Sequence, residues 1–185
     1  MKIVLVRHGK HEIETHNGKL LNEGKKQARL LAKKFKKIQI KDIYSSDLKR
    51  AEETAKILEK ELKIPVVTTS VLREWPREIL KKDKIGWKKE YQNQFKRLNK
   101  FLNEITKNRK EDVIVMVVAH GQLNKLIMAI MLNIDIKRAT PFMQDNSCVN
   151  VLEWNEHFKN WRLTLMNDTS HLNKNMDKLS INYRK

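Results

Sequence analysis

The sequence predicts an α/β fold, a three-layer α/β/α sandwich with a mostly parallel central sheet and a small cap segment. Three observations lead to this fold class. Short apolar runs typical of buried strands alternate with longer segments whose apolar residues recur at helical spacing. The last two strand-like runs follow each other directly, so we expect them to form an antiparallel edge. One irregular segment in the middle of the chain has neither pattern, which suits a cap.

Residues 2–6 and 22–37 are predicted to form the first strand and the first helix. The run at 2–6 is short and rich in β-branched residues, and it ends abruptly at Arg7-His8-Gly9, as a buried strand does where it enters a loop. After a polar stretch, apolar side chains recur through 22–37 at helical spacing, which predicts a helix with one apolar face.

A second strand and a second helix are predicted between residues 42 and 62. The strand covers 42–45, and apolar side chains then recur at helical spacing over 48–62. Ser46 or Asp47 is expected to be the N-cap of this helix, because both residue types accept hydrogen bonds from the first backbone N–H groups of a helix. Residues 65–69 can supply a third strand.

The second half of the chain resumes the alternation after an irregular segment. Residues 72–86 lack a clean period and contain Pro76, Gly86 and a charged cluster, so we expect a loop or cap there. The elements predicted beyond it are a long amphipathic helix at 87–106, the most apolar strand at 113–118, a helix at 123–130, and two strands around 149–151 and 161–165.

The length of 185 residues suits one domain with its own core. We expect a single domain over 1–172, with the cap segment at about 75–110, and a C-terminal tail at 173–185. No apolar run is long enough to span a bilayer, and the N-terminus leads into a strand rather than an export signal. The single cysteine, Cys148, cannot form an internal disulfide. Together these features favour a cytoplasmic protein that does not enter a membrane.

The chain is strongly basic. Lysine and arginine number 39 against 22 acidic residues, which gives a formal net charge of +17. Such a balance favours an anionic partner, whether a phosphorylated substrate, a nucleic acid or an anionic membrane. Many of the lysines occur as scattered Lys-Lys pairs, however, and this is typical of solvated helix faces. The charge therefore does not by itself indicate a specific nucleic-acid or membrane partner.

Two histidines occupy the position where ligands bind in open α/β sheets, just beyond the carboxyl ends of the strands. His8 and His120 each end an apolar strand, and each is followed by a glycine, Gly9 or Gly121. A glycine at this point lets the backbone approach an anion closely. Arg7 lies beside the first histidine and can reach the same edge of the sheet.

An arginine and a carboxylate complete this set. Arg50 lies in the first turn of the second helix, and Glu74 follows the third strand, with Glu78 as a nearby rival carboxylate. Guanidinium groups match phosphate oxygens bidentately, an imidazole can attack phosphorus, and a carboxylic acid can protonate a leaving oxygen. The set therefore suits phosphoryl transfer.

Several motifs resemble those of the histidine phosphatase (phosphoglycerate-mutase-like) superfamily, and they occur in the same order. The resemblance covers residues 2 to about 172, and its specificity comes from the series of motifs rather than from any one. The matching segments are Leu5-Val6-Arg7-His8-Gly9, Tyr44 to Ala55, Leu72-Arg73-Glu74, Val118-Ala119-His120-Gly121, Asn146-Ser147-Cys148-Val149, Asn167-Asp168 and His171-Leu172.

The resemblance implies the three-layer fold and a two-step reaction that needs neither a metal nor another cofactor. His8 would attack the phosphoryl group, and Glu74 would protonate the leaving alcohol and then activate a water. His120 would hold phosphate oxygens and count with these two as catalytic. The expected phosphate-binding residues are Arg7, Arg50, Gly9, Gly121 and Gln122.

The chain departs from the family after Arg7-His8-Gly9. Many members continue with Glu-Thr or Gln-Thr and then Trp-Asn, whereas this sequence has no clean counterpart over 10–17. His11 or Asn17 could take the place of the usual phosphate-contacting residue at the substrate rim. His8 and His11 are three residues apart, but without an obvious third ligand they do not indicate a metal site.

The leading interpretation is a phosphatase that acts on a phosphorylated small molecule, with a phosphoprotein substrate left open. Two alternatives remain at this point: a phosphoglycerate mutase and a non-catalytic phosphate-binding or scaffold protein. A nucleophile together with an acid argues against the scaffold, since binding alone requires neither. The sequence determines neither the individual substrate nor the oligomeric state.

Overall fold

A computed structural model describes residues 1–13, 17–81, 88–107 and 112–172. Its centre is a six-stranded sheet in the order β3-β2-β4-β1-β5-β6. The first four strands of that order run parallel, β5 is antiparallel to β1, and β6 is antiparallel to β5. The strands are β1 (Lys2–Arg7), β2 (Asp42–Ser46), β3 (Val66–Thr69), β4 (Ile114–Ala119), β5 (Val149–Asn155) and β6 (Asn160–Asp168).

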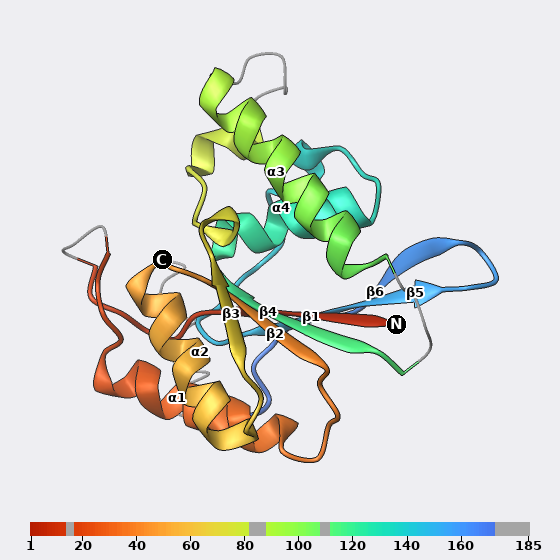
Figure 1. The fold of residues 1–185 in the computed structure, drawn as a ribbon. Helices are drawn as coiled ribbons and strands as arrows, with labels where there is room; N and C mark the ends of the chain where they lie inside the picture. Colours follow the sequence, from red (N-terminus) through yellow and green to blue (C-terminus); the bar gives the residue numbers. More distant parts are fainter. Residues whose placement is uncertain (14–16, 82–87, 108–111, 173–185) are drawn as a thin grey trace.

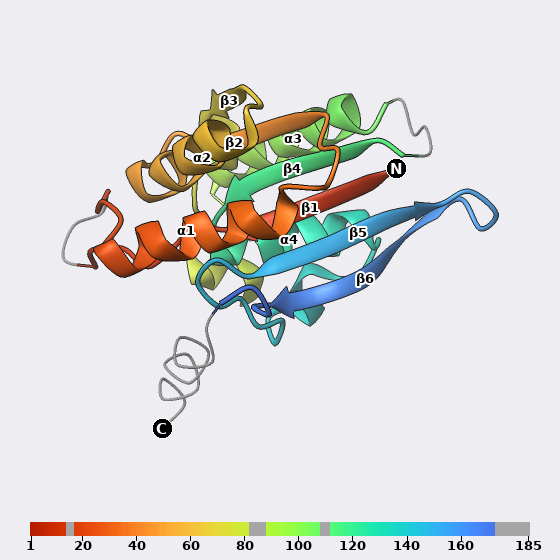
Figure 2. The same ribbon diagram turned by 90° about the horizontal axis from the view of Figure 1, so that it is seen from below.

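Helices cover both faces of this sheet, which confirms the predicted three-layer α/β class (Figure 1). On one face lie α1 (Asn22–Phe35) and α2 (Lys49–Leu62), and on the other α3 (Lys89–Ile105) and α4 (Gly121–Met131). The expected antiparallel edge is the β5–β6 hairpin, which projects beyond the helices in Figure 2. Within the described ranges, no helix is both long and apolar enough to cross a bilayer.

The alternation of side chains along the central strands divides the core in two. Ile3 and Leu5 of β1 pack into one cluster with residues of α3 and α4. Val4 and Val6 point to the other face and pack with residues of α1 and α2. A fully buried apolar side chain of this size stabilises the fold by roughly 1.5–3 kcal/mol. The helices predicted from apolar spacing therefore pack their apolar sides against the two faces of the sheet.

The segment expected to form a cap contains short helical turns and then α3. Among the described residues, the 3₁₀ turns η1 (Ser70–Leu72) and η2 (Arg77–Lys81) precede α3, and η4 (Ile136–Ala139) follows α4. Leu98 and Leu102 of α3 are buried in the core, so this helix belongs to the outer layer of the sandwich. Trp87, Gly86 and the tail at 173–185 lie outside the described residues.

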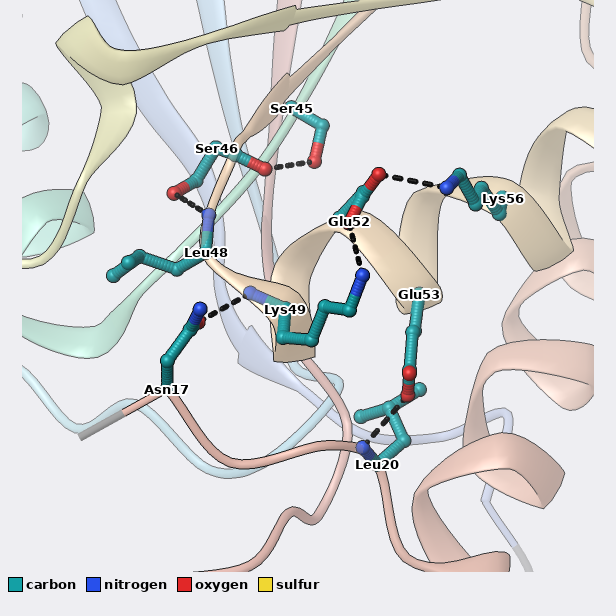
Figure 3. Close-up of polar contacts among 9 residues, drawn as sticks. All are labelled: Asn17, Leu20, Ser45, Ser46, Leu48, Lys49, Glu52, Glu53 and Lys56. Carbon is teal, nitrogen blue, oxygen red and sulfur yellow. Dashed lines mark hydrogen bonds and ion pairs between the residues drawn. The ribbon is translucent and has the colours of Figure 1, made fainter. Parts of the chain in front are cut away.

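The predicted N-cap of α2 is wrong. The helix begins at Lys49 with Leu48 in the N-cap position, and no side chain at that position caps it. Ser46 is instead the last residue of β2, and the carboxylate of Asp47 accepts two hydrogen bonds from Arg73 at 2.8 and 2.7 Å. The side-chain oxygen of Asn17 accepts from the Lys49 N–H at 2.7 Å (Figure 3). A residue from another loop therefore caps this helix.

Parallel pairing of β1 with β4 decides where the two histidines lie. Arg7 and Ala119 are register partners at the carboxyl ends of these strands, so His8 and His120 leave the sheet side by side. The backbone N–H of His8 also donates to the Ala119 carbonyl at 3.0 Å. The neighbouring strand β2 ends at Ser46 on the same edge, because it pairs with β4 up to Ser45 and Val118.

We predict that Gly24→Ala lowers the free energy of unfolding by about 1–3 kcal/mol. A Cβ on Gly24 would lie 2.0 Å from the backbone oxygen of Lys10, because the loop after β1 passes directly over the start of α1. This clash outweighs the better helix propensity of alanine. Denaturant titration measures the change.

Gly121→Ala is the matched control, because a Cβ on this first residue of α4 would meet nothing closer than the Arg7 Nε at 3.5 Å. Its stability should stay at or slightly above that of the parent chain. Equal stability for the two variants would contradict the close approach at Gly24.

Candidate active site

The ring of His8 is buried and held in one tautomer. Its side chain is 2% exposed, and Nδ1 lies 2.8 Å from the carbonyl oxygen of Gly9, an acceptor that requires the proton on Nδ1. The other nitrogen, Nε2, then carries the lone pair and accepts a hydrogen bond from the Arg50 Nε at 3.2 Å. The nucleophilic atom of this imidazole thus points at a guanidinium, in the direction where an anion would bind.

His120 faces His8 across the end of the sheet. The two ring centroids are 5.1 Å apart, and His120 is completely buried. Its Nε2 lies 2.8 Å from the Ser46 hydroxyl, whereas its Nδ1 is buried without a hydrogen-bond partner among the described residues. An unpaired buried ring nitrogen is costly, so this site favours a ligand that can accept or donate a hydrogen bond.

Two arginines supply positive charge beside these rings. Arg50, from the first turn of α2, is 7% exposed. Arg7, the last residue of β1, donates from Nη1 to the backbone oxygen of Gln144, and its buried Nε has no partner within the described residues. Burial and the neighbouring Arg7 charge both lower the pKa of Arg50, although the carboxylate of Glu74 opposes them. Two partly desolvated cations close together favour a dianion between them.

The same environment keeps both imidazoles neutral. Burial is the largest cause that lowers the pKa of His8 well below its usual value, followed by the charges of His120 and Arg7. Burial also lowers the pKa of His120 strongly, with help from Arg50 and Arg7. A neutral His8 keeps the lone pair that a nucleophile needs. The cations thus serve two purposes, because they attract an anion and prevent protonation of the ring that would attack it.

The carboxyl group of Glu74 lies at the N-terminus of α4, the helix that begins directly after His120. Its Oε1 accepts from the backbone N–H groups of Leu123 and Trp75, both at 3.1 Å, and Oε2 from that of Gln122 at 3.5 Å. Burial raises the pKa of Glu74 above its ordinary value, although these N–H groups and Arg7 oppose the shift. The rival carboxylate, Glu78, is exposed on η2. The structure therefore places Glu74 at the first turn of α4, which directly follows His120, and leaves Glu78 on the surface.

The two residues expected at the substrate rim lie in different places. His11 packs edge-on against His8, with ring centroids 4.6 Å apart, and its pKa falls to about 4 through burial and the charges of Arg50 and Arg7. It therefore belongs to the same cluster. Asn17 is exposed, and its side-chain oxygen accepts a hydrogen bond from the backbone N–H of Lys49, the first residue of α2 (Figure 3). Of the two, His11 lies against the ring that would react.

Gly9, Gly121 and Gln122, the other residues expected to bind phosphate, lie in the loop after β1 and at the start of α4. A Cβ on Gly9 would lie 2.7 Å from the Gly24 backbone oxygen, so the α1 backbone already excludes a side chain there. The Gly9 N–H donates to the Thr54 hydroxyl at 3.1 Å. Gly121 and Gln122 form the first turn of α4, whose backbone N–H groups favour negative charge. Their contact with phosphate stays a prediction.

A buried amide network behind Arg7 has no counterpart in the sequence prediction. The Gln144 amide nitrogen donates to the Asn150 Oδ1 at 2.8 Å, and Asn150 donates back to Gln144 at 3.0 Å. Asn150 also donates to the Leu5 carbonyl at 3.3 Å and accepts from the Asn167 N–H at 2.9 Å. Since the Gln144 carbonyl holds Arg7, this network sets the position of the guanidinium. Of its members only Asn167 lies in a family motif, and Gln144 and Asn150 flank the motif at Asn146 to Val149.

The loop that leads into β5 holds the backbone of His8. The His8 carbonyl accepts from the Ser147 N–H at 3.1 Å and from the Asn146 side chain at 3.3 Å. Ser147 adopts a positive φ of 58°, which turns its N–H toward His8. Across the described parts of the chain, His, Cys, Asp and Glu side chains nowhere gather in threes close enough to bind a metal ion.

We predict that Asn150→Ala lowers the free energy of unfolding by about 2 kcal/mol and turnover by about tenfold or more. The substitution removes both hydrogen bonds between the Gln144 and Asn150 side chains and the one that the Asn167 N–H donates, and it thereby loosens the support of Arg7. Chemical unfolding and steady-state kinetics measure the two effects.

Asn155→Ala is the matched control on the same strand. Its side chain accepts from the Phe158 N–H in the exposed hairpin turn, so its loss should reduce stability but leave turnover intact. Wild-type turnover in Asn150→Ala would show that the network stabilises the fold without positioning Arg7.

A known phosphatase resembles this chain over nearly its full length, and a known mutase resembles less than half of it. Phosphoserine phosphatase 1 of Hydrogenobacter thermophilus is 28% identical over 202 residues, which covers 93% of this chain and 94% of that protein. A 2,3-bisphosphoglycerate-dependent phosphoglycerate mutase of Thermoplasma acidophilum is 39% identical over 83 residues, 40% of this chain and 42% of its own. The match to the phosphatase is thus more extensive than the match to this mutase.

Solved structures share the fold. A mycobacterial glucosyl-3-phosphoglycerate phosphatase in complex with VO3 superposes with a TM-score of 0.76 at 22% identity, covering 91% of this chain and 99% of that one. Phosphoserine phosphatase of Entamoeba histolytica, in complex with 3-phosphoglyceric acid, gives 0.74 at 23% identity, with 93% and 99% covered. The family model of the histidine phosphatase superfamily, branch 1, matches residues 3–95 and 77–169. The chain therefore belongs to branch 1 of this superfamily and is a histidine-type phosphatase.

Proposed function

We propose that this phosphatase is a metal-independent phosphomonoester hydrolase that works through a phosphohistidine on His8. One observation carries the proposal. The Nδ1 proton of His8 is engaged by the Gly9 carbonyl, which leaves the Nε2 lone pair directed at the Arg50 guanidinium in a buried site. A nucleophile aimed at a phosphate-binding group is what in-line phosphoryl transfer requires.

In the first step, the His8 Nε2 attacks phosphorus and the ester P–O bond breaks. The protonated carboxyl of Glu74 gives its proton to the leaving oxygen, which departs as an alcohol. Arg7, Arg50 and His120 stabilise the charge on the equatorial oxygens during transfer. In the second step, Glu74 accepts a proton from water as that water attacks phosphorus, and inorganic phosphate leaves neutral His8. Each pKa shift favours the protonation state that its residue needs.

The size and packing of the cap favour hydrolysis over transfer to a second acceptor. A mutase must keep water away from the phosphohistidine while its partner reorients, and this requires a lid that closes over the site. Between Glu74 and β4 fewer than forty residues are available, and α3 takes 17 of them. Because Leu98 and Leu102 anchor α3 in the core, that helix is poorly suited to serve as the lid. The site should therefore stay accessible to water.

The substrate is proposed to be a phosphorylated small molecule. Phosphoserine, glucosyl-3-phosphoglycerate and 3-phosphoglyceric acid appear in the names of the related proteins and complexes. A screen of phosphorylated metabolites beside phosphopeptides, with wild type and His8→Ala in parallel, tests this choice. Turnover of phosphopeptides alone would move the assignment to a phosphoprotein.

We predict that rapid quenching without acid, during turnover in the presence of a chelator, traps a phosphoryl group on His8. The Nε2 atom is the buried nucleophile that faces Arg50, so it should carry the label. Mass spectrometry of peptides locates the group, and His8→Ala should lose all but a trace of activity. A label on His120, or rescue of chelated enzyme by a divalent metal, would refute this mechanism.

Hydrolysis of alkyl phosphates should decline on both sides of a pH optimum. As pH falls through the lowered pKa of His8 the nucleophile gains a proton, and as pH rises through the raised pKa of Glu74 the acid loses one. Glu74→Gln should slow alkyl phosphate hydrolysis by about 100-fold or more and remove the alkaline limb. Initial rates across pH give both profiles.

A leaving group that needs no proton provides the internal control. Glu74→Gln should slow p-nitrophenyl phosphate hydrolysis far less than alkyl phosphate hydrolysis, because p-nitrophenolate departs without protonation. Glu78→Gln, which alters an exposed carboxylate on η2, should leave both profiles as in wild type. If Glu78→Gln instead produced the leaving-group dependence, the general acid would be Glu78.

We predict that phosphate release exceeds phosphoryl transfer. With 3-phosphoglycerate and catalytic 2,3-bisphosphoglycerate supplied together, inorganic phosphate should be the main product because the short cap admits water. Phosphorus NMR distinguishes the products directly. Sustained formation of 2-phosphoglycerate faster than inorganic phosphate would make this chain a mutase.

A further inference from the structure

Ser46 is a buried serine at the carboxyl end of β2 that contacts one of the two histidines. It is completely buried, and its Oγ lies 2.8 Å from the Nε2 of His120, which is also completely buried. The same Oγ accepts a hydrogen bond from the backbone N–H of Leu48 at 3.2 Å (Figure 3). The serine that the sequence offered as a helix cap thus connects the end of β2 with the histidine that follows β4.

The hydroxyl of Ser46 has one proton to donate and two lone pairs that can accept. The Leu48 N–H occupies one lone pair, so the hydroxyl either donates to the His120 Nε2 or accepts from it. If Nε2 carried the proton, the hydroxyl would accept twice, and its own proton would find no acceptor in the described ranges. A buried donor without an acceptor is unfavourable. The hydroxyl of Ser46 should therefore donate to Nε2.

A neutral His120 whose Nε2 accepts a hydrogen bond must carry its proton on Nδ1. Burial lowers the pKa of His120 well below its ordinary value, with help from the charges of Arg50 and Arg7, so the ring holds a single proton at neutral pH. The Nδ1 atom is buried and has no hydrogen-bond partner among the residues that the structure describes. The ring proton therefore sits on the nitrogen that still needs an acceptor.

A second buried donor beside His120 also lacks an acceptor within the described part of the chain. The Nε of Arg7 has no partner there, and it lies 3.5 Å from the position that a Cβ on Gly121 would occupy. Gly121 directly follows His120, and Arg7 directly precedes His8, whose ring centroid is 5.1 Å from that of His120. Two unpaired N–H groups beside the nucleophile favour an oxyanion that accepts from both.

His8 and His120 then share one tautomer but present opposite ends of the ring to the site. In His8 the Nδ1 proton is engaged by the Gly9 carbonyl, and the Nε2 lone pair faces Arg50. In His120 the Nε2 lone pair is engaged by Ser46, and the Nδ1 proton remains to be donated. A single hydroxyl on a neighbouring strand therefore makes the second ring a donor instead of another nucleophile.

We propose that Ser46 is a positioning residue that holds His120 in the Nδ1–H tautomer, so that this ring donates a hydrogen bond to an oxygen of the transferring phosphoryl group. The inference rests on the proposed function, since it defines how His120 contacts the phosphoryl group. In the other tautomer a lone pair on Nδ1 would face the anion and repel it. Without the hydroxyl His120 can adopt both tautomers, and only the fraction with the proton on Nδ1 can serve as the donor.

Nitrogen NMR of the full chain with isotope-labelled histidine tests the tautomer, because protonated and unprotonated ring nitrogens resonate in separate regions. The signals that His120→Asn removes identify those of His120. In wild type at neutral pH the Nδ1 should carry the proton and the Nε2 should not. Inorganic phosphate or vanadate should shift the Nδ1–H signal, because the proton gains an acceptor. A protonated Nε2, or a Nδ1–H signal that neither anion moves, would overturn the inference.

Ser46→Ala should lower kcat by about tenfold or more, because it removes the hydroxyl that fixes the donor. The nitrogen signals of His120 in this variant should show both tautomers. Ser46→Thr keeps a hydroxyl at the same position and should restore the single tautomer and most of the turnover. Alanine also leaves the Leu48 N–H without its acceptor, so the melting temperature of each variant is measured beside its kinetics.

Ser45→Ala is the matched control. Ser45 is equally buried and adjacent in sequence, but its hydroxyl donates to the Ser46 carbonyl at 2.9 Å (Figure 3). This variant should lose some stability and keep the wild-type turnover and tautomer. If Ser46→Ala lost no more turnover than Ser45→Ala at a comparable melting temperature, Ser46 would only stabilise the end of β2.

The failures of the two proposals are distinguishable. If wild type forms the phosphohistidine on His8 while His120 carries its proton on Nε2, the proposed function stands and the role of Ser46 is refuted. If the phosphoryl group is trapped on His120, the proposed function is refuted whatever tautomer the free enzyme has. Trapping on His8 together with a His120 Nδ1–H signal that responds to phosphate is the result that both proposals require.

Discussion

The parallel pairing of β1 with β4 is the constraint on which the rest of the site depends. It brings two chain segments more than a hundred residues apart into register, so that Arg7 lies opposite Ala119 and the histidines after them emerge together. The pairing is stable because both strands are buried on both faces, between α1 and α2 on one side and α3 and α4 on the other. The reactive groups therefore sit on the rigid centre of the sheet.

Burial of charge next to imidazole is what makes the site reactive, and it carries a cost in stability. Arg7 and Arg50 are held close to His8 and His120, where burial reduces the screening of their charge by water. Loss of hydration at such groups is only partly offset by hydrogen bonds to Gln144, Ser46 and Gly9. A bound phosphate dianion would neutralise the cations, so ligand binding should stabilise the fold.

The antiparallel edge contributes more to the site than an edge hairpin ordinarily would. Asn150 on β5, with Gln144 in the preceding loop, holds the carbonyl that supports Arg7, while Asn146 and Ser147 hold the carbonyl of His8. Buried amides of this kind must be fully paired, or they cost more than an apolar core would. The family motif at Asn146 to Val149 thus has a physical role in positioning, although it touches no reacting atom.

The sequence by itself determined the fold class, the helical faces and the histidines at the strand ends, because periodicity and strand ends are local properties of the chain. The sequence also identified Glu74 as the candidate acid, through the family motif Leu72-Arg73-Glu74. Only the tertiary structure decided that Asn17 caps α2, that Asp47 pairs with Arg73, and that Gln144 supports Arg7. Each of these is a hydrogen bond between segments distant in sequence, and no local period encodes such a partner.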